Sequence, residues 1–246
     1  NNIKSLNFFK DVKTDIQNNN ENETKIITIN VEEKPTGEIM AGAGFGTSGT
    51  TTTFGVKENN YLGSGISLDA NLNLSEESIK GKMSLNNPNF NNSNKSIYTN
   101  IQSSETDRLT DFGYKTNKTG FTLGTEFEYF DDFFLGMGVN SYYESIKTDS
   151  TASSQQKKLK GNYFDNFLSL NFDYDKRNQK FQTTQGFRNY FATDLPIVSE
   201  TNTLSNTFII SSYIEYLDNH VLKSSFYFKN SNSISGDNIK LSERLY

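Results

Sequence analysis

Residues 121–129 of the chain read FTLGTEFEY, and this stretch decides the fold class. Phe121, Leu123, Phe127 and Tyr129 lie at every second position, while Thr125 interrupts the apolar series without changing its period. A period of two places alternate side chains on opposite faces of an extended strand. The stretch therefore predicts a β-strand with one apolar and one polar face.

The same alternation recurs along most of the chain, for example over residues 66–74, 164–174 and 204–216. It predicts an all-β fold with about eleven strands, near 38–46, 50–58, 65–75, 77–87, 95–104, 115–129, 132–147, 161–175, 186–195, 201–217 and 219–230. Strands of about ten residues or more are long enough to cross a bilayer with tilt.

The composition excludes several classes of protein. Hydrophobic residues make up 33% of the 246 residues and the mean hydropathy is -0.66, so no stretch approaches the ~20 apolar residues of a spanning helix. With 20 Phe and 13 Tyr, the chain is not disordered. A net charge of -5 with scattered basic residues argues against nucleic acid as a partner. One His and no Cys argue against a zinc site, and we expect no metal and no cofactor.

Loop lengths bear on the choice between a soluble β-sandwich and a membrane barrel. Tight turns are expected at 75–76, 130–132 and 218–219, and long polar loops near 105–114, 148–160 and 231–240. Short turns at one end and long loops at the other are typical of outer-membrane barrels. A soluble sandwich also alternates, but strand length and loop asymmetry favour a transmembrane antiparallel barrel.

Residues 1–34 follow a different pattern. The spacing of Ile3, Leu6 and Phe9 fits the end of a helix, and strands are expected over 11–16 and 24–33. The sequence Lys34-Pro35-Thr36-Gly37 then marks a break. A helix end and one hairpin cannot bury a core, so we expect this segment to be half of a domain in which the chain begins.

Four local motifs occur in a fixed order over nearly the whole chain. They are Phe8-Phe9-Lys10-Asp11-Val12 with Val31-Glu32-Glu33-Lys34-Pro35-Thr36-Gly37; Asn59-Asn60-Tyr61-Leu62-Gly63-Ser64-Gly65; Asn87-Pro88-Asn89-Phe90; and Tyr174-Asp175-Lys176-Arg177-Asn178 followed by Phe181 and Thr184-Gln185-Gly186-Phe187-Arg188. Together they resemble the BamA outer-membrane protein assembly factor family. Asn178 stands where that family has Asp, and Thr183 where it has Pro.

The resemblance implies a division of the chain. Residues 1–34 would be the C-terminal part of the last periplasmic POTRA domain, which is α+β. Residues 35–246 would be the N-terminal two thirds of a sixteen-stranded outer-membrane β-barrel, ending before the family's Arg-Gly-Phe/Tyr lumen loop.

The resemblance also implies a function, the non-enzymatic insertion of β-barrel proteins into the outer membrane. The partners would be unfolded β-barrel clients, accessory lipoproteins of the assembly complex and outer-membrane lipids. The first barrel strand would pair with a client strand at a lateral gate, and its residues are Glu38, Ile39, Met40, Ala41, Gly42, Ala43, Gly44, Phe45 and Gly46.

Several alternatives remain open. The glycines at 42, 44 and 46 fit either a soft pairing edge or a lumen face that avoids crowding. The sequence Gly44-Phe45-Gly46-Thr47-Ser48-Gly49 matches a dinucleotide fingerprint, but a threonine run follows it and predicts a hairpin instead. Paired carboxylates such as Asp131-Asp132, in a turn, and Asp173/Asp175, on one strand face, fit solvated turn or lumen residues better than acid–base catalysis or calcium binding. The other functions considered are a relative for two-partner secretion or autotransporter assembly, and a passive porin or adhesin barrel.

Overall fold

A computed structural model of the chain describes residues 8–19, 24–46, 49–179, 182–200, 202–218, 220–236, 238–240 and 243. A two-stranded hairpin comes first, with β1 at Phe9–Asn19 and β2 at Thr24–Glu33. An antiparallel sheet of eleven strands follows, in which each strand pairs with its neighbours in sequence. Its strands are β3 (Gly37–Gly46), β4 (Gly49–Tyr61), β5 (Ile66–Ser75), β6 (Ser78–Asn87), β7 (Lys95–Arg108), β8 (Tyr114–Phe130), β9 (Phe133–Thr148), β10 (Gly161–Asp175), β11 (Gly186–Val198), β12 (Thr203–Leu217) and β13 (His220–Ser233).

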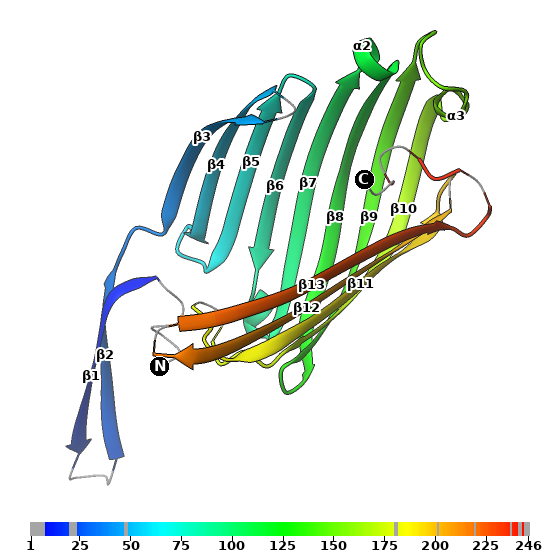
Figure 1. The fold of residues 1–246 in the computed structure, drawn as a ribbon. Coiled ribbons are helices and arrows are strands. Elements are labelled where there is room, and N and C mark those ends of the chain that lie inside the picture. Colours follow the sequence, from blue (N-terminus) through cyan, green and yellow to red (C-terminus); the bar gives the residue numbers. More distant parts are fainter. Residues whose placement is uncertain are drawn as a thin grey trace.

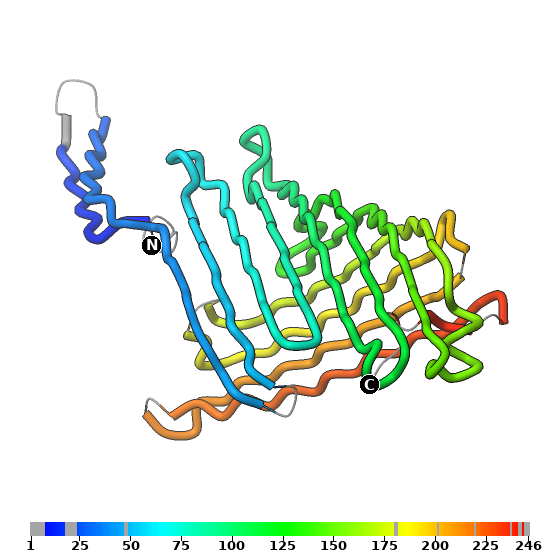
Figure 2. The backbone as a smooth tube through the Cα atoms, turned by 90° about the horizontal axis from the view of Figure 1, so that it is seen from above, coloured from blue at the N-terminus to red at the C-terminus, as the bar shows by residue number. Residues whose placement is uncertain are grey.

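The sheet is strongly curved. In Figure 1, β3 to β9 stand side by side and β11 to β13 cross in front of them. The view from above shows the same sheet rolled into an open trough, with the β1–β2 hairpin projecting away from it (Figure 2). The strands therefore form a wall with a concave inner face and a convex outer face, and β3 and β13 are its two edges.

The two faces of the wall have the reverse of the polarity found in a soluble protein. On β10, Asp165, Asn171 and Asp173 are buried on the inner face, while Phe164 on the outer face is 53% exposed. On β8 the outer face exposes Leu123 by 55%. A soluble sandwich buries its apolar face against a second sheet, whereas a membrane barrel turns it toward lipid. The burial pattern therefore supports the barrel interpretation and contradicts the soluble sandwich.

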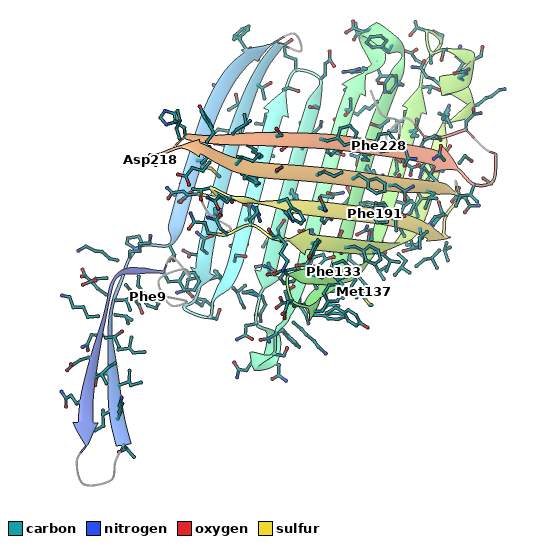
Figure 3. All side chains as sticks on the ribbon, turned by 60° about the horizontal axis from the view of Figure 1, so that its bottom comes forward. Phe9, Phe133, Met137, Phe191, Asp218 and Phe228 are labelled. Carbon is teal, nitrogen blue, oxygen red and sulfur yellow. The ribbon has the colours of Figure 1, made fainter. Side chains whose placement is uncertain are left out.

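Aromatic side chains form two rows across the outer face. In the middle of the wall, Phe191 packs against Phe172 at 5.9 Å and Phe208 at 4.5 Å between ring centroids, and Phe228 continues the row (Figure 3). At the end that carries the 131–132 turn, a second row has centroid distances of 4.5 to 6.3 Å, and its members are Phe130, Phe133, Tyr174 and Phe187. Aromatic rows near the end of the strands are typical of the girdles at the membrane–water interfaces of barrels.

The inner face is built partly on glycine–aromatic pairs between neighbouring strands. Tyr98 lies opposite Gly124, and a Cβ added to Gly124 would meet the Tyr98 ring at 2.3 Å. Tyr142 lies opposite Gly120 in the same way. Covering a strand glycine with an aromatic ring compensates for its missing side chain.

The strand prediction is confirmed: eleven strands are found at the expected places. The prediction that Phe9 belongs to a helix is wrong, because Phe9 begins β1; Ile3 and Leu6 lie outside the described residues. In the part of the chain that the structure describes, no helix has the length and hydrophobicity needed to span a membrane.

The predicted separation of short turns from long loops is also wrong in part. The turn at 76–77 lies at the same end of the wall as the loops at 109–113 and 149–160, because all three follow strands that run in one direction. Conversely, the ten-residue connection from β10 to β11 lies at the end with the 131–132 turn. Parts of the expected loops are regular structure: 105–108 and 231–233 extend β7 and β13, and short helices α2 (Leu109–Phe112) and α3 (Ser154–Lys158) fill the connections that follow β7 and β9.

Candidate functional site

The strand proposed for client pairing, β3, is an edge of the sheet. It pairs with β4 on one side and has no strand on its other side among the described residues. Every residue of β3 is exposed, and the exposed fraction reaches 87% for Ile39 and 90% for Phe45. An edge strand presents a row of unpaired N–H and C=O groups, which is a template for another strand.

The two faces of β3 differ in side-chain size. Ile39 and Phe45 lie on the outer face with two alanines between them, opposite Val56 and Phe54 of β4 and its threonine run. The inner face carries Gly42 and Gly44, and a Cβ added at either would meet nothing within 4 Å. Within the described part of the chain, no atom crowds these two glycines.

The glycine-rich sequence over 44–49 lies in a hairpin and not in a nucleotide site. Gly46 ends β3, Gly49 begins β4, and the two are paired. A dinucleotide site needs a helix directly after the glycines. The hairpin interpretation is confirmed.

Polar contacts hold the start of β3 against the turn between β4 and β5. The Thr36 hydroxyl donates to the Glu58 carboxylate, and the Asn59 side chain donates to the Thr36 carbonyl at 3.2 Å. The Asn60 backbone N–H donates to the same carboxylate at 2.7 Å, and its side-chain oxygen accepts from Gly65 N–H at 2.7 Å. The motif around Tyr61 thus fixes the position at which the edge strand begins.

Left-handed backbone explains the glycines of that turn. Leu62, Gly63 and Gly65 have φ of 54°, 69° and 71°. Glycine adopts this region without strain, while Leu62 does so at a cost. The third motif is likewise a turn: after Pro88, the residues Phe90–Asn92 reverse the chain, with left-handed φ of 55° at Asn91 and 54° at Asn92, and Phe90 is 46% exposed.

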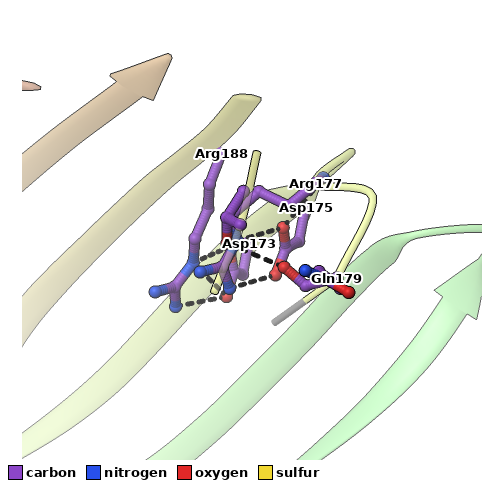
Figure 4. Close-up of polar contacts among 6 residues, drawn as sticks. Asp173, Asp175, Arg177, Gln179 and Arg188 are labelled. Atoms are coloured by element: carbon purple, nitrogen blue, oxygen red, sulfur yellow. Dashed lines mark hydrogen bonds and ion pairs between the residues drawn. The ribbon is translucent and has the colours of Figure 1, made fainter. Parts of the chain in front are cut away.

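The fourth motif carries two ion pairs on the inner wall. Arg177 donates to the Asp175 carboxylate at 2.7 and 2.6 Å, and Arg188 donates to Asp173 with a shortest distance of 2.6 Å (Figure 4). The Asp175 carboxylate raises the pKa of Arg177, a turn residue, so this guanidinium stays charged. Gly186 closes the connection with φ 104°, where a Cβ would meet the Lys176 carbonyl at 2.1 Å.

Residues 60–246 match the Omp85 superfamily domain. The chain belongs to the Omp85 superfamily. Its fold is similar to the crystal structure of BamA from Haemophilus ducreyi lacking POTRA domains 1-3, with a TM-score of 0.73 and 20% sequence identity. That match covers 97% of this chain and 49% of the other, so the chain spans about half the length of that structure. The resemblance to the BamA family is confirmed as a resemblance of fold, and membership of the Omp85 superfamily makes the wall part of an outer-membrane β-barrel.

The three turns that carry the second, third and fourth motifs all lie at one end of the wall. The turns after β4, β6 and β10 are on the side from which β3 starts, as the strand order requires. The departure at Asn178 has a local explanation. Its side-chain oxygen accepts from the N–H groups of Thr184 and Gln185, both at 3.2 Å, and its amide donates to the Thr184 hydroxyl at 2.7 Å. The neutral amide of Asn178 can make all three of these hydrogen bonds, because it carries both an acceptor and a donor. Phe181 of the same motif lies outside the described residues.

The other carboxylates singled out in the sequence have structural partners. Asp132 accepts from Lys176 at 2.6 Å and links two neighbouring turns of this Omp85 domain. Asp173 and Asp175 are the arginine partners described above. His220 is exposed, and its Nδ1 lies 2.9 Å from the Asp218 carbonyl.

A polar hollow of about 710 Å³ lies on the inner wall near the fourth motif. Arg177, Arg188 and Lys223 line it together with Glu126 and three tyrosines. Sequence reasoning found the two arginines only as parts of a turn and missed Lys223 and the tyrosines. The alternation of apolar and polar residues shows on which face of its strand a residue lies. It does not show which strands come close to one another when the sheet curves, so it could not bring these residues together.

Proposed function

We propose that this chain forms part of the barrel wall of an outer-membrane assembly factor, and that β3 receives the client's strand at a lateral gate. The observation that carries the proposal is the composition of β3, the first strand of the sheet, which has glycine or alanine at most of its positions from 41 to 46. In hydrocarbon, each unpaired backbone polar group costs several kcal/mol. A client strand that pairs with β3 removes this cost from both partners.

The mechanism uses hydrogen bonding and burial alone. The client strand adds to β3 by β-augmentation, and Ile39 and Phe45 cover the outer face of the new pair toward lipid. Further client strands add as hairpins until the new barrel closes, so no covalent step and no cofactor take part. Gly42 and Gly44 have no side chain, which leaves the inner side of the new pair open to clients of different sequence.

The β1–β2 hairpin fits the proposed end of a POTRA domain on the periplasmic side. One of its faces is apolar: Ile16 and Ile27 lie opposite each other and are 59% and 60% exposed, and Ile29 and Val31 continue the face. An exposed apolar face of this kind is normally covered by further structure. The Lys34 N–H donates to the Phe8 carbonyl at 3.1 Å, which joins the base of the hairpin to the first residues after it. In this proposal the complete arm receives unfolded clients, and accessory lipoproteins bind to it.

One observation favours a second function, the export of a partner protein through the lumen. The inner wall is polar, and the hollow beside Arg177 and Arg188 suits a hydrated passage. An exporter needs that passage but does not need a free edge at β3.

Site-specific photo-crosslinking in the full-length protein in cells separates the two functions. The crosslinker is placed at Ile39, Ala41 and Ala43 on the outer face of β3. Matched controls are Leu123 and Leu170, on the outer face of β8 and β10 in the middle of the sheet. Adducts with nascent outer-membrane proteins at the three β3 positions alone are expected. The crosslinker is also placed at Tyr190 and Tyr213, which line the inner hollow. Adducts with a single secreted protein at these two positions, and none at β3, would show that the chain exports and does not insert.

A further inference from the structure

The outer face of β8, β9 and β10 carries three rows of different chemistry toward the end of the wall with α2 and α3 (Figure 1). The antiparallel register aligns these rows across the strands. From the middle of the wall outward, the rows contain first Tyr143 and Phe164, then Ser145 and Asn162, and last Lys115 and Lys147. Neighbouring rows are two residues apart, which is about 7 Å along a strand.

The last row places two lysines directly opposite each other, Lys115 on β8 and Lys147 on β9. Like charges in this position destabilise a sheet. Lys115 is balanced by Glu105 at 2.7 Å and Asp107 at 3.1 Å. Lys147 is exposed and makes no ion pair with any described residue, and the same holds for exposed Lys160, which directly precedes β10 and comes next in this register. Two cations of the row are therefore available to an anion outside the chain.

The two rows below the lysines have the order of groups that a lipid headgroup meets at a membrane surface. Tyr143 and Phe164 are 52% and 53% exposed, and aromatic side chains at this level mark the membrane–water interface of a barrel. Above them, the side chain of exposed Asn162 makes no hydrogen bond within the described part of the chain, so its amide can both donate to and accept from hydroxyl groups. Lysine stems extend along a surface and carry their ammonium groups outward, to the level of the headgroups.

We propose that the outer face of β8 to β10 binds the headgroup of a phosphorylated glycolipid in the outer leaflet of the membrane. Lys147 and Lys160 hold a phosphate, which relieves the repulsion within the lysine row. Ser145 and Asn162 form hydrogen bonds with sugar hydroxyls, and the acyl chains lie against the aromatic row. The assignment to the outer leaflet rests on the proposed periplasmic place of the β1–β2 hairpin, but the inference does not depend on client pairing at β3.

The first test measures the binding of fluorescent lipopolysaccharide to the full-length protein in detergent. In the double variant Lys147→Gln/Lys160→Gln we expect the Kd to rise about thirty-fold, because each lysine near an anionic lipid surface contributes about five-fold. Lys147→Arg/Lys160→Arg should keep the native Kd because it retains both charges. The matched control is Lys80→Gln/Lys82→Gln, which removes two exposed lysines from the inner face of β6. Equal Kd values for the first variant and this control, each with a native heat-modifiable band on a gel, would refute the site.

The second test identifies the headgroup. The native protein should bind dephosphorylated lipopolysaccharide as weakly as the Lys147→Gln/Lys160→Gln variant binds the intact lipid. Asn162→Ala should raise the Kd for lipopolysaccharide about five-fold, as expected for one lost hydrogen bond, and leave the Kd for phosphatidylglycerol unchanged. Equal losses for the two lipids would overturn the assignment to a glycolipid. Client crosslinks at β3 should persist in the Lys147→Gln/Lys160→Gln variant, so failure of the lipid site can be told apart from failure of the lateral gate.

Discussion

Replacing Gly120 with alanine should destabilise the barrel wall strongly, although the change adds one methyl group. Gly120 is on the inner face of β8, directly opposite Tyr142 of β9. A Cβ at this position would lie 2.2 Å from Tyr142 Cδ1 and 2.5 Å from the Ser141 carbonyl oxygen. Ordinary van der Waals contact begins at 3.4 Å, so the carbonyl would have to retreat by 0.9 Å.

The cost of that retreat follows from where Ser141 sits. Its strand is paired on both sides, with Phe121 of β8 and Asn166 of β10, so the carbonyl cannot move without disturbing both ladders. The added methyl group would also push the Tyr142 ring away from Gly120. This would weaken the cation–π contact of that ring with Lys118, whose Nζ lies 4.5 Å from the ring centroid. Overpacking costs about 1–3 kcal/mol. The lower entropy of the unfolded chain offsets about 0.4–1 kcal/mol of this cost, so a net destabilisation of about 1–2 kcal/mol is expected.

The matched control is Gly44→Ala on β3. Its Cβ meets nothing within 4 Å, and the backbone of Gly44 lies outside the left-handed region, so the substitution should be neutral or stabilise by about 0.4–1 kcal/mol. Both variants are made in the full-length protein, and the fraction of folded band on unheated gels is followed through a urea series. If the two variants unfold at the same urea concentration, the argument from close contact is refuted.

Three further predictions concern the turns. Arg177→Met should destabilise the protein by about 3 kcal/mol, because it leaves the buried Asp175 carboxylate without its guanidinium; the exposed Lys176→Met should change stability by less than about 1 kcal/mol in the same urea series. Asn178→Asp keeps both accepted N–H bonds and should cost less than about 1 kcal/mol, whereas Asn178→Ala should cost about 1–2 kcal/mol, and equal midpoints for the two would contradict this. The hydroxyl and backbone N–H of Thr151 lower the pKa of Asp149 in the folded protein. The ionised Asp149 therefore stabilises the turn fully above the ordinary Asp pKa of about 4, and this stabilisation is lost as the pH falls through the lowered pKa of the folded state. Protease cleavage within 149–160 should therefore rise at acid pH in the native protein, and Asp149→Asn should remove this pH dependence.

The strands could be predicted from the sequence because their signal is local. Alternation over residues 121–129 or 164–174 is set by which face of each strand meets lipid, and no distant residue is needed to detect it. Strand ends were less accurate because they depend on partners. Residues 105–108 look like a polar loop, yet Lys115 of β8 lies 2.7 Å from Glu105 and 3.1 Å from Asp107, and these cross-strand ion pairs continue β7 to Arg108.

The position of the candidate edge strand could be predicted because its signal is also local, whereas the contacts that hold this strand could not. The edge strand was located from its glycines and from the family resemblance, but the contact between Thr36 and Glu58 joins residues 22 apart and has no local signature. Lys240 gave no signal at all: it lies in a polar stretch and would be expected in solvent, and only the return of the chain onto β9 and β10 buries it.

The contrast between the two edges bears on how a client would be selected at β3. β13, the last strand of the described sheet, carries large side chains, with Phe226, Tyr227 and Phe228 each exposed by 46% or more, so a strand that pairs with it has to match them in shape. β3 has glycine or alanine at most of its positions from 41 to 46. Cross-strand side-chain pairs contribute about 0.2–1 kcal/mol each, and an edge with few side chains forgoes most of that selectivity. What remains at β3 is backbone hydrogen bonding, which every strand offers equally, so an edge of this composition is suited to pair in turn with clients of unrelated sequence and to release them.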